Sequence, residues 1–390
     1  MDRRHTTTSR GRRRPDARPL ITPESVTFRY LDDGDDLRAV SLVQEVVWPR
    51  EGPPFHRAPD GLWEVRLPRP PVDRMEYRFE LIHAGESEEG SATLVLDPAN
   101  PRIAPGAFGE RSVVEFPEYS PPWWVEAGPA AVDRAPAGDG ALAGDGALAG
   151  DGAGGGLFEL ALPAPTLGTE QPCLLWSPPS SDAGDELPLL VVLDGLEFAR
   201  FAGLPRMLDL LVASGEVPPM RALLLHPVKR EEDYSASPEF AASLAQEILP
   251  ALSEIAALRA EPHFRVGLGA SLGGLALMHV HSEHPGVFGG LYLQSSSFLH
   301  GRQLPSENLA RISSFVDDLL ARSLRPSPLP VVMTCGTVEQ NLGNNRAIFA
   351  VLGEQGYPAE LHVVRDAHNW IAWRDAWTPH LPALLRELWA

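Results

Sequence analysis

Residues 264–288 constrain the fold more than any other part of this chain, because they read as a strand, a sharp turn and a helix in immediate succession. The turn is GASLG, residues 269–273, and it matches the pattern G-x-S-x-G. In that pattern the serine occupies a strained strand-to-helix corner, with its hydroxyl exposed at the end of a parallel sheet. Glycines are needed at Gly269 and Gly273 because side chains there would collide across the turn. Ser271 is therefore a candidate nucleophile.

The pattern by itself has a second interpretation, a glycine-rich turn whose serine only caps a helix. In a chain with 35 glycines, a chance match is expected roughly 0.2 times. The flanking strand and helix therefore matter more than the motif, and the rest of the chain must supply a base and an acid.

Composition limits the class of protein. With 390 residues, 44% of them hydrophobic, the chain can form a large core and two domains. Its net charge of −19 argues against a general nucleic-acid-binding protein. No apolar stretch follows the Arg-rich start as in a signal peptide, and no run of 18 apolar residues could span a membrane. We therefore expect a cytosolic protein with neither nucleic acid nor membrane as a partner.

The two cysteines, Cys173 and Cys335, lie in apolar runs that read as strands. They predict buried thiols, not a disulfide framework or a metal site. The sequence indicates neither a metal nor a cofactor.

Four segments follow one another along the chain. Short alternating strands at about ten-residue spacing predict an antiparallel β-sandwich, whereas the later apolar strands that alternate with helices predict a mainly parallel sheet with helices on both faces. A repeated Gly-Asp-Gly-Ala-Leu-Ala stretch between them reads as a flexible linker. The predicted segments are a disordered Arg-rich tail at 1–21, a sandwich at 22–126, the linker at 127–156 and an α/β domain at 157–390.

Two side chains follow late strands at the positions where a base and an acid are expected. In enzymes whose nucleophilic serine occupies a G-x-S-x-G corner, the serine, the acid and the histidine come in that order along the chain, each at the carboxyl end of a strand. His368 follows the strand that ends at Val364, and Glu339 follows the strand that ends at Gly336. Asp366 is an alternative acid, but a residue two positions from the base rarely reaches the imidazole from the required direction.

Stabilising an oxyanion requires two backbone donors. The N–H of Leu272, directly after the nucleophile, is one candidate, and the N–H of Leu196, after a strand that ends Asp-Gly, is the other. Gly195 allows the backbone to approach a substrate closely, although it can also be a plain turn glycine. The histidines of the helix after Ser271 (His279, His281 and His284) are spread around it, so we expect exposed or capping roles and no metal site.

With these pieces placed, the chain resembles the enterochelin esterase family, whose members join an N-terminal immunoglobulin-like domain to an esterase-D-type α/β-hydrolase domain. The resemblance extends over about residues 22–390, apart from the linker. It rests on matching residues at 97–101, 122–123, 192–195, 230–235, 240–250, 269–273, 294–298, 336–339, 345–346 and 368–370. Residues 366–367 before His368, and Glu197-Phe198 after Gly195, depart from the family pattern, which bears on the substrate more than on the reaction.

The resemblance implies ester hydrolysis of a catecholate trilactone siderophore such as enterobactin, often as the ferric complex, in the cytosol. Because such a complex is an anion and this protein is acidic, a local cationic patch is required. Arg230, Arg346 and Lys229 are its candidates, with Trp370 as a stacking surface, although each can also be a structural ion pair or core aromatic. The alternatives are a carbohydrate esterase of the feruloyl or acetyl type, and a non-catalytic hydrolase-fold protein that binds a ligand or partner.

Overall fold

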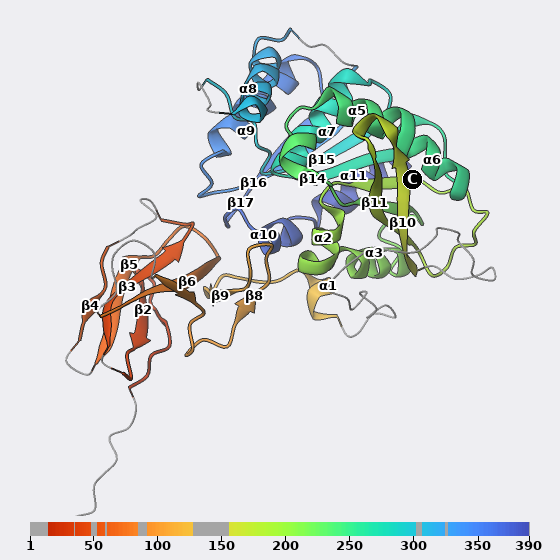
Figure 1. The fold of residues 1–390 in the computed structure, drawn as a ribbon. Coiled ribbons are helices and arrows are strands. Elements are labelled where there is room, and N and C mark those ends of the chain that lie inside the picture. Colours follow the sequence, from red (N-terminus) through yellow and green to blue (C-terminus); the bar gives the residue numbers. More distant parts are fainter. Residues whose placement is uncertain are drawn as a thin grey trace, which may run out of the picture. The chain divides into compact units, whose positions relative to one another are not determined.

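The computed structural model describes residues 15–34, 36–47, 53–58, 61–84, 92–127, 156–301, 306–323 and 327–389. Most of the Arg-rich tail and nearly all of the predicted linker lie outside these ranges. The chain divides into two compact units, Met1–Ala104 with Phe108–Pro117, and Pro105–Ala107 with Glu118–Ala390 (Figure 1).

The first unit is all β and forms two antiparallel sheets, which fit the predicted immunoglobulin-like sandwich. One sheet has the order β1-β2-β5-β4, and the other has the order β3-β6-β9-β8, with β7 paired to β6. The strands are β1 (Leu20–Ile21), β2 (Ser25–Leu31), β3 (Leu37–Gln44), β4 (His56–Arg57), β5 (Leu62–Pro68), β6 (Arg74–His83), β7 (Thr93–Val95), β8 (Ile103–Ala104) and β9 (Arg111–Glu115).

The core of the first unit consists of the side chains that point inward at alternate positions of these strands. Phe28, Tyr77 and Phe79 are fully buried and meet edge to face, which is a favourable arrangement of aromatic rings. The buried Tyr77 hydroxyl donates to Asp97 Oδ2 at 2.5 Å and accepts from Asn100 Nδ2 at 3.0 Å. The Asp-Pro-Ala-Asn segment therefore fixes the chain against β6.

The second unit holds an eight-stranded sheet in the order β10-β11-β13-β12-β14-β15-β16-β17. Every neighbouring pair from β13 to β17 is parallel, whereas β10 and β11 pair antiparallel. The strands are β10 (Gly156–Ala164), β11 (Thr169–Ser177), β12 (Leu189–Val192), β13 (Arg221–Leu225), β14 (Arg265–Ala270), β15 (Gly290–Gln294), β16 (Val331–Gly336) and β17 (Ala359–Val364). This is the α/β-hydrolase arrangement that the sequence predicts.

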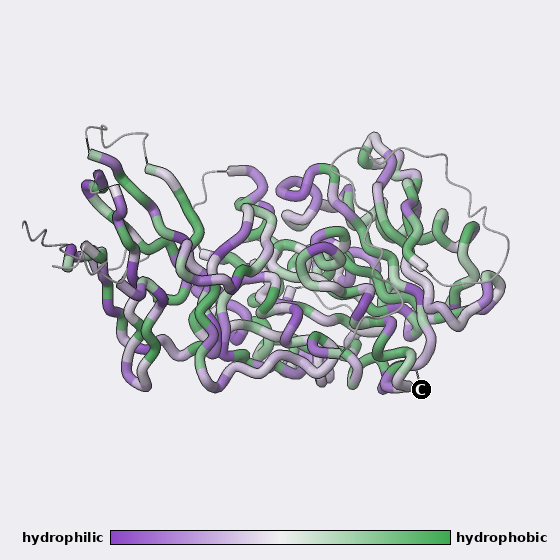
Figure 2. Tube along the Cα trace, turned by 90° about the horizontal axis from the view of Figure 1, so that it is seen from below, coloured by the Kyte–Doolittle hydropathy of each residue, from purple (hydrophilic) through white to green (hydrophobic). Residues whose placement is uncertain are grey.

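Helices cover both faces of this sheet (Figure 1). One face packs against α5 (Pro238–Ser243), α6 (Leu249–Ile255), α7 (Leu272–Glu283), α8 (Glu307–Leu320) and α9 (Leu342–Glu354). The other packs against α1 (Trp123–Glu126), α2 (Gly195–Ala202), α3 (Leu204–Ala213), α10 (Trp370–Asp375) and α11 (His380–Trp389). Val191 points into the first core and Val192 into the second, so a buried strand needs apolar residues at every position. Figure 2 shows long hydrophobic segments through the interior of this unit.

Several predicted details differ from the structure. The sequence placed residues 118–126 in the first domain, but Trp124 of α1 is buried in the second unit and stacks on Trp377 at 6.0 Å. Strand β1 already pairs with β2 before the predicted start at residue 22. The prediction of exposed or capping roles is wrong for His279 and His281: both are buried, His279 against Phe315 of α8 and His281 against Tyr357.

Candidate active site

Ser271 occupies the corner between β14 and α7, in a backbone conformation that non-glycine residues rarely adopt, with φ 55° and ψ −120°. Such a conformation costs on the order of 1–3 kcal/mol and persists only where the surroundings hold it. Here the Ser271 N–H donates to the Gln294 carbonyl at 2.8 Å, and the Ser271 carbonyl accepts from the Ser297 N–H at 3.0 Å. A Cβ at Gly269 would lie 2.6 Å from the carbonyl carbon of Gly273, so the corner requires that glycine.

His368 and Glu339 lie beyond the carboxyl ends of neighbouring strands, β17 and β16, and their side chains meet. His368 Nδ1 lies 2.7 Å from Glu339 Oε2, and the Glu339 side chain is 2% exposed, against 37% for His368. A carboxylate only accepts hydrogen bonds, so this contact places a proton on Nδ1 and leaves Nε2 free to accept one.

Asp366, the alternative acid, has other contacts. Its Oδ1 accepts from the Ala367 N–H at 2.7 Å and from Asn369 Nδ2 at 3.1 Å, so it shapes the turn that carries His368. The structure brings Glu339 to the imidazole.

The hydroxyl of Ser271 contacts a residue that the sequence analysis did not single out. Ser271 Oγ lies 3.1 Å from Ser297 Oγ, and within the described ranges no hydrogen bond joins it to His368. Contacts between a nucleophile and its base are often long without substrate and shorten when substrate binds. The sequence feature that could have indicated Ser297 is its place in a polar Ser-Ser-Ser run directly after β15.

The two predicted oxyanion donors lie in the first turns of α7 and α2, which follow the neighbouring parallel strands β14 and β12. The first N–H groups of a helix have no partner within it. In α7 the Leu275 N–H bonds back to the Ser271 carbonyl, and in α2 the Phe198 N–H bonds back to the Asp194 carbonyl. The helical bonds therefore begin after Leu272 and Leu196, and neither N–H is used by its helix.

Gly195 is required by packing. A Cβ at this position would lie 2.3 Å from the Cα of Leu224 on β13, so any other residue would push α2 away from the sheet. A role in approach to the substrate stays a prediction.

The predicted cationic patch is largely occupied by ion pairs. Arg230 donates two hydrogen bonds to the buried Asp194, from Nε to Oδ1 at 2.7 Å and from Nη2 to Oδ2 at 2.6 Å. Lys229 is exposed and lies 3.7 Å from Glu232. Arg346 is exposed on α9. The Arg230–Asp194 pair fixes the residue that precedes the Leu196 turn, so Arg230 has a structural role whether or not it also meets substrate.

A contact between a histidine and a glutamate, missed from the sequence, lies beside this turn. His226 Nδ1 lies 3.2 Å from Glu197 Oε1, and this contact raises the pKa of His226 above its usual value. Glu197 is one of the departures from the family pattern, and its partner follows β13 immediately. Nothing in the local sequence joins the two positions.

Trp370 belongs to an aromatic cluster. Its ring meets Phe198 edge to face at 5.1 Å and Trp373 at 4.9 Å, while remaining half-buried. Trp373 in turn meets the His368 ring edge to face at 4.9 Å. The cluster supports the imidazole from one side, and use of Trp370 as a stacking surface stays a prediction.

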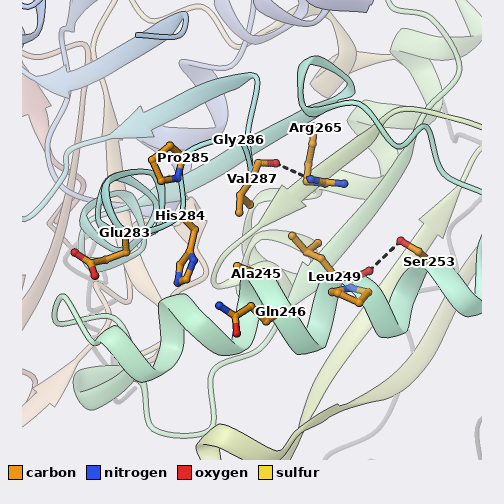
Figure 3. Close-up of a pocket in the computed structure, with 11 residues that line it drawn as sticks. Ala245, Gln246, Leu249, Ser253, Arg265, Glu283, His284, Pro285, Gly286 and Val287 are labelled. Atoms are coloured by element: carbon orange, nitrogen blue, oxygen red, sulfur yellow. Dashed lines mark hydrogen bonds between the residues drawn. The ribbon is translucent and has the colours of Figure 1, made fainter. Parts of the chain in front are cut away.

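A pocket of about 540 Å³ lies at the opposite end of the sheet from Ser271 (Figure 3). It is lined by residues from α6, the end of α7 and the start of β14, among them Arg265, Glu283 and His284. Arg265 is the first residue of β14 and Ala270, beside Ser271, is the last, so the pocket is separated from the site by the length of the strand. Within the described ranges, no group of three metal-ligating side chains could hold a metal ion, and no helix is long and apolar enough to cross a membrane.

Comparisons with known proteins identify the family of the domain that carries this site. Residues 164–384, more than half of the chain, match a family model described as "Putative esterase". An iron(III) enterobactin esterase from Dickeya dadantii (strain 3937) is 25% identical over 203 residues, which are 50% of this chain and 47% of that protein. The chain thus aligns with about half the length of this curated relative.

Two solved structures share the fold of both units. Enterobactin esterase from Shigella flexneri, solved in the presence of enterobactin, matches with a TM-score of 0.72 at 19% identity, covering 95% of this chain and 94% of that one. Ferric enterobactin esterase from Salmonella typhimurium matches with a TM-score of 0.73 at 19% identity, covering 93% and 94%. The fold predicted from the sequence, an α/β-hydrolase domain preceded by an immunoglobulin-like sandwich, is confirmed.

Proposed function

Because the chain belongs to the esterase family of the matched model, we propose that it hydrolyses carboxylic esters, with Ser271 as nucleophile, His368 as base and Glu339 as the acid that orients the base. The observation that carries this proposal is the 2.7 Å contact between Oε2 of the buried Glu339 side chain and His368 Nδ1. It sets the imidazole in the tautomer that can accept a proton at Nε2, at the same edge of the sheet as the strained Ser271.

The proposed reaction has two halves. Ser271 Oγ attacks the ester carbonyl while His368 Nε2 takes its proton, and the N–H groups of Leu272 and Leu196 stabilise the tetrahedral oxyanion. The imidazolium returns the proton to the leaving alkoxide, which departs as the alcohol and leaves an acyl-serine. Water, deprotonated by the same imidazole, then releases the acid and restores Ser271.

For the substrate we propose a catecholate siderophore trilactone such as enterobactin, either iron-free or as the ferric complex, and its cleavage in the second case releases iron in the cytosol. Support comes from the relatives, since one curated sequence is an iron(III) enterobactin esterase and one solved structure was obtained with enterobactin. Lys229 and Arg346, both exposed, are the proposed contacts for the anionic ligand, together with the solvent-exposed part of the Arg230 side chain.

Hydrolysis of iron-free and ferric enterobactin beside a feruloylated sugar tests the proposal, with products identified by mass. Release of dihydroxybenzoyl-serine fragments by the wild type supports the siderophore substrate. Cleavage of the sugar ester alone would replace that substrate with a carbohydrate ester.

The matched variant Ser271→Ala should lower kcat by about 10⁴ to 10⁶-fold and leave thermal unfolding nearly unchanged. An activity near that of the wild type would exclude Ser271 as nucleophile. Absence of turnover by the wild type with all three substrates and with an activated ester would favour a binding protein.

A further inference from the structure

Behind the proposed acid lies a chain of buried hydrogen bonds that the sequence analysis did not foresee. While Glu339 Oε2 faces His368, Glu339 Oε1 accepts two hydrogen bonds, from the Ser295 hydroxyl at 2.6 Å and from the Gly336 N–H at 2.6 Å. Both distances are short, as expected for donors to an ionised acceptor. The orientation of the carboxylate is thus set from the side opposite to the imidazole.

Ser295, which makes this contact, has an unusual backbone conformation. It directly follows β15, its φ is 48°, and it is 1% exposed. A non-glycine residue in the left-handed region costs on the order of 1–3 kcal/mol, and such residues cluster at functional sites. The conformation is held by the Ser295 N–H, which donates to the Thr334 carbonyl at 2.7 Å, and by Asn341 Nδ2, which donates to the Ser295 carbonyl at 2.7 Å.

The direction of the Ser295 hydroxyl is also determined. Trp373 Nε1 lies 3.0 Å from Ser295 Oγ, and an indole N–H can only donate. Ser295 therefore accepts from Trp373 and gives its own proton to Glu339 Oε1. The same Trp373 ring meets His368 edge to face, so one tryptophan supports the base directly and the acid through Ser295.

We propose that Ser295 and Trp373 are positioning residues of the hydrolytic reaction, which keep the Glu339 carboxylate aimed at His368 Nδ1. This inference rests on the proposed function and extends it to two residues that act through the acid. Removing the Ser295 hydroxyl leaves Glu339 with one donor fewer, so the carboxylate is free to turn away from Nδ1 and stabilises the imidazolium less.

The test uses the full chain and an activated ester, a p-nitrophenyl ester, so that it does not depend on the siderophore. Ser295→Ala and Ser295→Gly both remove the hydroxyl, but glycine also relieves the strained φ and should fold at least as well as the wild type. Each should lower kcat by about 10- to 100-fold, the effect of one hydrogen bond to a charged group, with KM changed less than about threefold. The acidic limb of the kcat/KM profile should move to lower pH in both, because a misaligned carboxylate stabilises the protonated base less.

Trp373→Phe is a second test, because it keeps an aromatic ring at the position beside His368 and removes the indole N–H together with the five-membered ring that carries it. We expect a smaller loss of kcat, about two- to tenfold, with the same shift of the acidic limb. Trp377→Phe is the matched control: Trp377 is also buried and donates to Gln294 Oε1 at 2.9 Å, outside the Glu339 contacts. Its kcat per folded molecule should equal that of the wild type.

The outcomes separate this inference from the proposed function. If both Ser295 variants fold and keep the wild-type kcat and pH profile while Ser271→Ala is inactive, the positioning role is overturned and the serine mechanism stands. If Ser271→Ala remains active, the proposed function fails and the positioning role fails with it. A loss of activity in Ser295→Ala that Ser295→Gly restores would assign the effect to backbone strain and would also overturn the inference.

Discussion

The contacts of Glu339 make its replacement by glutamine a demanding test of the proposed triad. Oε1 receives two donors, the Ser295 hydroxyl and the Gly336 N–H, whereas Oε2 faces His368 Nδ1. In Glu339→Gln the amide oxygen must therefore occupy the Oε1 position, and the amide NH₂ points at the imidazole. Nδ1 can then only accept, which moves the ring proton to Nε2 and prevents that nitrogen from taking a proton from Ser271.

The expected size of the effect follows from the lost charge. The centres of the carboxylate and the imidazolium lie about 4 Å apart, and at an effective dielectric constant of about 20 their attraction is about 4 kcal/mol. At about 1.36 kcal/mol per tenfold change this amounts to about 10³-fold in kcat, and the wrong tautomer raises the loss toward 10⁴-fold. KM should change little, because the charge pair forms only as the proton is transferred.

The assay is steady-state hydrolysis of a p-nitrophenyl ester, with thermal unfolding recorded for each variant. Asp366→Asn is the control, because it retains an oxygen that can accept from the Ala367 N–H and should keep kcat within about tenfold of the wild type. The reasoning is refuted if Glu339→Gln stays within tenfold of the wild type, or if Asp366→Asn loses more activity than Glu339→Gln does.

Three further substitutions test neighbouring features. Arg230→Gln should lower the free energy of unfolding in urea by about 3 kcal/mol, because it leaves the Asp194 carboxylate buried without its partner. The double variant with Asp194→Asn should regain most of that loss, and a double variant as unstable as Arg230→Gln would contradict the pairing. Burial lowers the pKa of His279 and of His281 to about 4 from 6.5, so the unfolded state binds more protons between these values and stability should fall as the pH falls through this window, by up to about 1.4 kcal/mol per pH unit for each histidine. His281→Gln should remove one histidine's share of that slope in urea unfolding at pH 4.5 to 7, and an unchanged slope would show that His281 does not titrate as described. Ser297→Ala should change kcat for the p-nitrophenyl ester by less than about tenfold, since one neutral hydrogen bond is lost; a loss above 10³-fold would place Ser297 in the reaction itself.

Local patterns predicted the fold class and the candidate nucleophile because both depend on short stretches of chain. A run of apolar residues such as 189–193 must be buried on both faces of a sheet. The glycine at 269 is required because a Cβ there would collide with the backbone of Gly273 across the turn. Glu339 and His368 could be proposed because each follows the carboxyl end of a strand, where the sheet brings such residues to one edge. What the sequence left open was which carboxylate reaches the imidazole.

Predictions about exposure and charge were less successful. Exposed or capping roles were predicted for His279 and His281 because helical spacing distributes them around α7. Both instead pack against residues of later segments, Phe315 and Tyr357, and nothing within α7 itself indicates this. Arg230 was a candidate for the cationic patch with a structural ion pair as the alternative, and its guanidinium binds Asp194, 36 positions earlier in the chain. Both outcomes depend on distant elements.

The sequence by itself determined the sheet, the strained corner at Ser271 and the strand ends where the chemistry can take place, because backbone sterics and hydrophobic periodicity act over a few residues. Only the tertiary structure decided that Glu339 meets His368, that Ser295 and Trp373 hold Glu339, and that Arg230 is paired. These contacts join residues far apart in the chain, across loops whose paths are set by packing. Burial then decides the strength of each contact, because a charge removed from water must find its partner within the fold.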